Sequence, residues 1–140
     1  MALNRQYIEQ LPIPQISSDE DSGIVHLVDW LLWLHRQESV KTGEGPDASL
    51  DPLIASYFEQ WLNGMVYELF FPDELHAAHI RLFDLTLKLK LPEVGNVPEA
   101  GRLEFIRKEF RRLYDENGAL RSALFTLGNL AEVRIIEGTT

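Results

Sequence analysis

The 140-residue sequence contains no cysteine and no apolar run that approaches the length of a membrane span. The missing cysteine excludes disulfides, thiolate metal ligands and a thiol nucleophile. A helix needs about 20 consecutive apolar residues to cross a bilayer, so no transmembrane helix is expected. The first ten residues also lack the basic and then apolar pattern of a signal peptide. These absences predict a soluble, cytoplasmic protein without a membrane partner.

Motifs that would carry catalysis are missing as well. The sequence has no Gly-x-Ser-x-Gly, no Gly-x-Gly-x-x-Gly and no Gly-rich phosphate loop followed by lysine. His76 and His79 lie three residues apart with Glu74 nearby, which is a spacing that zinc sites use. A metal site needs further ligands, and neither His26 nor His35 has a reason in the sequence to approach. We therefore predict no catalytic, cofactor-binding or metal-binding residue in this chain.

Negative charge dominates the composition, with a formal net charge of −9 at neutral pH. Residues 1–97 hold 15 acidic and 6 basic residues, whereas residues 98–140 hold 7 of each. Nucleic-acid binding draws most of its affinity from lysine and arginine that neutralise phosphates. The chain as a whole is therefore a poor stand-alone DNA or RNA binder, and any contact with nucleic acid has to be local.

The first 16 residues differ in character from the rest. They include Leu11-Pro12-Ile13-Pro14, in which each proline biases the preceding residue toward an extended backbone. A domain rarely begins with an unpaired strand. We therefore interpret residues 1–16 as the extended tail end of an upstream domain, and residues 17–140 as one helical domain of ordinary size.

Apolar residues recur at helical spacing through most of the chain after residue 16. The clearest series runs from Ile54 to Leu69 and contains Gly64, whose helix propensity is about 1 kcal/mol worse than that of alanine. Such a glycine indicates a close helix crossing. The pattern predicts an all-α fold, with five or so helices in antiparallel hairpins, over residues 17–41, 51–71, 73–90, 99–116 and 119–127.

Local signals support two of the predicted helix starts. Ser17 and Glu20 have the spacing of a capping box before the first helix. Asp51 followed by Pro52 is typical of an N-cap and a proline in the first helical turn. We therefore expect the Asp51 side chain to cap the second helix.

Two tryptophans widen the apolar face of the first helix. Trp30 and Trp33 lie on the flank of its stripe of aliphatic residues, so the face is broader than a single neighbouring helix requires. Either the helix packs on two sides, or the tryptophans form an exposed aromatic strip, which would be an interface for a partner.

One basic cluster stands out in the neutral part of the chain. It consists of Arg107, Lys108, Arg111 and Arg112, with Glu104 and Glu109 interleaved. The cluster is either a solvated helix face held by ion pairs between neighbouring turns or a face that contacts nucleic-acid phosphates. Charge reversal at Arg111 and Arg112 in the intact protein distinguishes the two through the salt dependence of DNA affinity.

Several segments together resemble a known family. These are IEQLPIP (residues 8–14), IVHLVD (24–29), LNGMVYELF (62–70), FPDELHAA (71–78) and VRIIEG (133–138). They are similar to the C-terminal region of adenine-specific DNA methyltransferases of the Eco57I and TaqI-like kind, the type IIG restriction–modification enzymes. The segment at 62–70 resembles the family's I-D-x-L-V-Y-E-L-Y stretch, with Asn63 in place of the usual aspartate.

The resemblance implies a helical C-terminal domain that follows the target-recognition domain of such an enzyme. Family members methylate an adenine amino group with S-adenosylmethionine, through an Asn/Asp-Pro-Pro-Tyr/Phe motif and a Gly-rich cofactor loop. This chain has neither, so no catalytic or cofactor residue carries over. The implied parent is a site-specific enzyme of restriction–modification or phage defence, and the implied partners are the rest of that chain, DNA through the parent, and a second subunit.

A different class of function is compatible with the same residues. The chain could be a stand-alone all-α module for protein–protein interaction, unrelated to DNA, that shares helix motifs with the methyltransferases. Protease sensitivity confined to residues 1–16 would favour the fragment of a larger enzyme, because a free-standing module should bury that segment against its own helices.

Overall fold

The computed structural model describes residues 16–44, 48–115 and 118–130. Within these ranges the fold is all-α, as predicted, with no strand. The described helices are α2 (Ser18–His35), α3 (Glu38–Thr42), α4 (Asp51–Phe70), α5 (Pro72–Ala77), α6 (Leu82–Leu89), α7 (Arg102–Leu113) and α8 (Ala119–Leu127). The predicted extended segment, apart from Ile16, and the segment at 133–138 lie outside the described residues.

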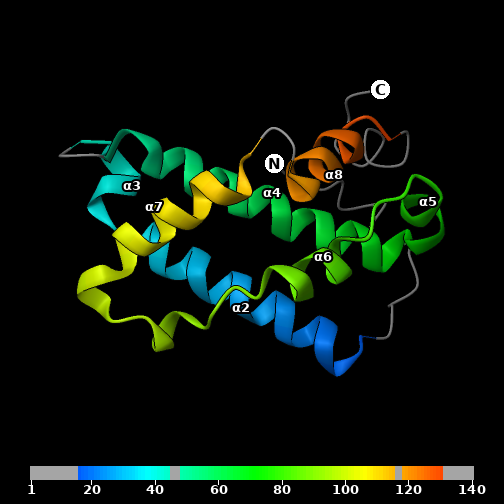
Figure 1. The fold of residues 1–140 in the computed structure, drawn as a ribbon, viewed down its shortest axis with the longest axis horizontal. Coiled ribbons are helices and arrows are strands. Elements are labelled where there is room, and N and C mark those ends of the chain that lie inside the picture. The colour runs from blue at the N-terminus through cyan, green and yellow to red at the C-terminus, as the bar shows by residue number, and fades with distance from the viewer. Residues whose placement is uncertain (1–15, 45–47, 116–117, 131–140) are drawn as a thin grey trace, which may run out of the picture.

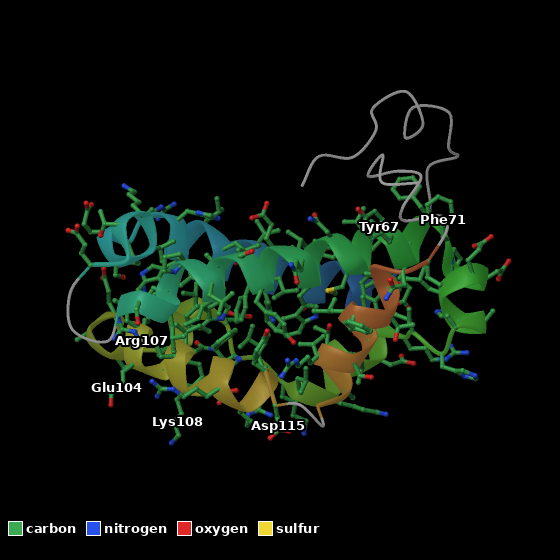
Figure 2. The ribbon with its side chains drawn as sticks, turned by 90° about the horizontal axis from the view of Figure 1, so that it is seen from above. Tyr67, Phe71, Glu104, Arg107, Lys108 and Asp115 are labelled. Carbon is green, nitrogen blue, oxygen red and sulfur yellow. The ribbon has the colours of Figure 1, made fainter. Side chains whose placement is uncertain are left out.

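The fold is organised around the two longest helices (Figure 1). Helices α2 and α4 lie side by side in opposite directions, and the short α3 joins them at one end. Helix α7 lies across one end of this pair, and α6 and α8 lie at the other. Figure 2 shows α2 and α4 in one layer and α6, α7 and α8 in a second layer, with α5 at the end of α4. Helix α4 packs against α2, α6, α7 and α8, so it is the central element of the core.

The capping box predicted at the first helix is present. Ser17 Oγ accepts a hydrogen bond from the Glu20 N–H at 3.2 Å, and Glu20 Oε1 accepts one from the Ser17 N–H at 3.1 Å. The helix does not continue to residue 41, however. Gln37 has an extended backbone, and its side-chain amide donates to the Trp33 carbonyl at 2.9 Å. This contact ends α2 at His35, and α3 begins at Glu38 as a separate helix.

The predicted helix at 73–90 is also two helices. Helix α5 begins at Pro72, one residue before the predicted start, but it ends at Ala77. His79 adopts a left-handed backbone with φ of 63°, and the Ile80 N–H donates to the Leu75 carbonyl at 2.8 Å. This turn buries Ile80, which is 1% exposed, and redirects the chain into α6.

The remaining helix bounds differ less from the prediction. Residues 99–101 form a 3₁₀ turn before α7, and Tyr114 lies just beyond its end. Helix α4 ends one residue earlier than predicted, and α8 covers residues 119–127 as predicted. No helix in the described ranges is long and apolar enough to cross a membrane.

Gly64 lies where side chains of two other helices pack tightly against α4. An ideal Cβ at this position would lie 2.5 Å from Leu82 Cδ1 in α6 and 3.0 Å from Leu127 Cδ2 in α8. No larger residue fits without displacing these leucines. The close crossing that the glycine indicated is therefore present, between α4 and two helices of the second layer.

Candidate functional site

The basic cluster of α7 is the strongest candidate site from the sequence, and the structure divides it. Its four members are Arg107, Lys108, Arg111 and Arg112. Two of them, Arg107 and Arg112, form ion pairs with carboxylates of this chain. Lys108 and Arg111 are exposed, and no hydrogen bond or ion pair joins them to any residue that the structure describes. Arg107 and Arg112 thus fit the interpretation of a helix face held by ion pairs, whereas Lys108 and Arg111 remain available to contact phosphates.

The Arg107 side chain points into the protein and pairs with a buried carboxylate. Its Nε donates to Asp51 Oδ1 at 2.8 Å and its Nη2 to Asp51 Oδ2 at 2.7 Å. This two-pronged geometry is the strongest form of an arginine–carboxylate contact. Asp51 is 0% exposed, at the first residue of α4, so the pair joins the start of α4 to the middle of α7. Figure 2 shows Arg107 beside the first turn of α4.

The role of Asp51 differs from the predicted one. Its side chain makes no capping hydrogen bond at the start of α4. Burial by itself raises the pKa of the Asp51 carboxyl, but hydrogen bonds and the charge of Arg107 outweigh burial and leave the pKa below its usual value. The nearby Ser39 hydroxyl acts in the same direction, although its oxygen is buried without a hydrogen bond of ordinary geometry. Asp51 is therefore an anion held inside the protein by an arginine.

Arg112 lies on the surface and pairs within its own helix. Its Nη2 contacts Glu109 Oε2 at 2.6 Å, in the i, i+3 arrangement. The Arg112 side chain is 52% exposed, and exposed pairs of this kind contribute less than about 1 kcal/mol. Such a weak pair leaves the arginine side chain able to exchange its partner.

A second buried carboxylate was not singled out by the sequence. Glu68 lies in α4 and is 7% exposed. Its Oε1 accepts hydrogen bonds from the Leu82 N–H at 2.6 Å and the Phe83 N–H at 3.2 Å, which are the first amides of α6. Its Oε2 lies 3.0 Å from His76 Nε2. Glu68 thus caps α6 from a different helix and holds α5 at the same time.

The two histidines with zinc-like spacing, His76 and His79, take unequal positions. His76 is partly buried against Glu68, whereas His79 is exposed in the turn between α5 and α6. Within the part of the chain that the structure describes, no group of three or more histidine, aspartate or glutamate side chains could hold a metal ion.

Beside Glu68 and His76 is a pocket of about 320 Å³, whose lining also includes Asp19, Glu20, Arg81 and Asp84.

The tryptophans do not form the exposed strip that was one of the two alternatives. Trp30 is 0% and Trp33 is 8% exposed. Trp30 stacks on Phe105 of α7 with ring centroids 5.9 Å apart, and its Nε1 donates to the Pro92 carbonyl at 2.8 Å. The two-sided packing of α2 is therefore confirmed, with α4 on one side and the 91–105 region on the other.

The segment that carries much of the family resemblance lies where α4 packs against several other helices. Residues 62–70 form the last two turns of α4. They supply Gly64 at the close crossing, Glu68 at the start of α6 and Tyr67, which is 2% exposed. Gly64 and Glu68 hold α4 against α5, α6 and α8. Glu68 and His76 also line the pocket of about 320 Å³.

In comparisons with known proteins, no family model, curated protein or solved structure matches this chain.

Proposed function

We propose that this chain is the helical C-terminal domain of an adenine-specific, site-specific DNA methyltransferase of a restriction–modification or phage-defence system. In that role it supports the target-recognition domain and holds the assembly together. It carries out no catalysis itself. Methyl transfer from S-adenosylmethionine to a flipped adenine belongs to other domains of the parent enzyme.

The observation that carries this proposal is the structural role of the segment at 62–70. The family-like residues Gly64, Tyr67 and Glu68 are all buried. Glu68 joins α4 to α5 and α6, and Gly64 lies where α4 crosses α6 and α8. A family-like motif whose residues join several helices is what a support domain requires.

The outer surface of α2 gives a second line of support. Val25 and Leu32 lie two turns apart on one face of this helix and are 45% and 52% exposed. Contact with another protein surface would cover these two side chains together with the exposed Asp29 that lies between them. The rest of the methyltransferase chain, or a second subunit, would supply that surface.

The test is a measurement of adenine methylation in the source cell. Codons 18–127 are deleted from the chromosomal gene, and N6-methyladenine is mapped by single-molecule sequencing. We expect one DNA sequence motif to lose its methylation and to regain it when the intact gene is returned. A methylation map identical to that of the parent strain contradicts the proposal and favours the stand-alone interaction module.

A pair of glycine variants makes the test specific for a support role. Gly64→Leu places a side chain into the crossing of α4, α6 and α8, whereas Gly95→Leu places one where no atom lies within 4 Å. We expect methylation to fall in the Gly64→Leu strain and to stay normal in the Gly95→Leu strain. Normal methylation in both strains would show that the packing of this domain does not matter to the enzyme.

A further inference from the structure

The exposed face of α7 differs in charge from the rest of this acidic chain. Lys108 and Arg111 lie three residues apart and project from the same side of the helix. With Arg107 and Glu104 they line a hollow of about 440 Å³. In Figure 2, Glu104 and Lys108 point away from the helices of the core, while Arg107 points toward the start of α4.

The ion pairs of the cluster decide which cations remain for a ligand. Asp51 offsets the charge of Arg107, and Glu109 offsets that of Arg112. Lys108 and Arg111 keep their charge without a carboxylate partner in the part of the chain that the structure describes. Arg107 is held in place by two hydrogen bonds, so it forms a fixed wall of the hollow.

We propose that Lys108 and Arg111 together bind phosphates of the DNA backbone at the α7 hollow. This inference rests on the proposed function, and it gives the domain a positioning contact that carries no sequence information. Two cations on one helix face match the repeated negative charge of a duplex, and backbone contacts of this kind set the register of a protein on DNA. Glu104 lies in the same hollow and weakens the contact by repulsion.

The size of the effect follows from counterion release. Each phosphate neutralised contributes about −0.9 to the slope of log K against log salt concentration. Two contacts therefore give a slope of about −1.8, and affinity should fall about 60-fold for a tenfold rise in salt. The acidic remainder of the chain keeps the binding weak, so the measurement belongs at low salt.

The test uses the 140-residue chain and a fluorescent DNA duplex of about 20 base pairs, with anisotropy measured over a series of salt concentrations. We expect Lys108→Ala/Arg111→Ala to abolish the salt-dependent binding. The matched control is Arg36→Ala/Lys88→Ala, which removes two exposed cations, one just after α2 and one in α6, and changes the net charge equally. The control should bind like the wild type. An equal loss in both double variants, or no binding by the wild type at low salt, would overturn the proposal.

A gain-of-binding variant guards against loss through unfolding. Glu104→Gln removes the carboxylate beside the two cations, so we expect tighter binding, by a factor of a few, with the same salt slope. Weaker or unchanged binding contradicts a phosphate contact at this hollow.

The two proposals can fail separately. Loss of cellular methylation on deletion, together with equal DNA binding by both double variants, would leave the support domain standing and refute the phosphate site. An unchanged methylation map, together with loss of DNA binding only in Lys108→Ala/Arg111→Ala, would refute the support domain and leave the phosphate site standing.

Discussion

The buried pair of Asp51 and Arg107 yields a quantitative prediction. Arg107→Met keeps most of the apolar stem of the side chain but removes the guanidinium that holds Asp51. The carboxylate is then left without its partner at a position where it is 0% exposed. We expect the 140-residue chain to lose a substantial part of its free energy of unfolding, because an uncompensated buried charge is costly.

The magnitude follows from the geometry of the pair. Removing one partner of a buried, hydrogen-bonded ion pair costs about 3–5 kcal/mol, whereas an exposed pair contributes about 0–1 kcal/mol. The Asp51 side chain is 1% and the Arg107 side chain 17% exposed, so the larger figure applies. The position of Asp51 at the first turn of α4 offsets part of the loss, since the helix dipole favours a negative charge there. We therefore expect about 3 kcal/mol, out of a typical total of about 5–15 kcal/mol.

The pH dependence of stability distinguishes the loss of the ion pair from a simple loss of packing in Arg107→Met. In the wild type the Asp51 pKa is lowered, so its contribution to stability is present above the unfolded pKa of about 4 and is lost as pH falls through the folded pKa. In Arg107→Met, burial acts without the arginine and raises the pKa. The folded state then binds more protons than the unfolded state, and its stability should rise as pH is lowered from 7 toward 4.5.

The assay is urea unfolding followed by tryptophan fluorescence at several pH values. The control is Asp51→Asn/Arg107→Met, which removes both charges and should recover at least half of the loss at neutral pH. A loss below about 1 kcal/mol in Arg107→Met, with no gain on acidification, would refute the assignment of a buried, unscreened pair.

Other positions give equally direct tests. Gly64→Leu should lower the free energy of unfolding by about 1–3 kcal/mol or more through overpacking, whereas Gly95→Leu should stay within about 0.5 kcal/mol, and equal values would exclude the close crossing. Glu68→Ala should speed amide exchange in α6, because its first N–H groups lose their acceptor; unchanged exchange measured by mass spectrometry would contradict that cap. Burial raises the pKa of Tyr57 to about 12, so its neutral form contributes stability that is present below about pH 10 and lost between pH 10 and 12. Tyr57→Phe should remove an absorbance step near pH 12 at 295 nm, and persistence of that step would assign it to another tyrosine.

Features set by neighbouring residues could be predicted from the sequence. The capping box at Ser17, a helix start within one residue of 73 and the helix at 119–127 depend on nearby residues, and the structure has all three. The close crossing at Gly64 was also indicated, because a glycine inside a strong helical pattern needs a reason in the packing.

Features set by distant contacts could not be predicted in this way. Asp51 had the local pattern of a cap, and only the fold brings Arg107, 56 positions later, against it. The breaks at Gln37 and His79 interrupt apolar periodicity that continues across them, because burial of Ile80 and a bond to the Trp33 carbonyl outweigh the local preference. The basic cluster was visible, but its division into paired and unpaired cations required the positions of the acidic partners.

The same pair of Asp51 and Arg107 has a consequence for the order of events during synthesis. The ribosome completes α2 and α4 before it makes α7, so the emerging hairpin contains Asp51 without its counter-ion. An unpaired carboxylate resists burial, and this end of the hairpin should therefore stay open and hydrated until Arg107 leaves the exit tunnel. Closure of the core then waits for the C-terminal third of the chain, which protects the nascent protein from settling early into a two-helix structure.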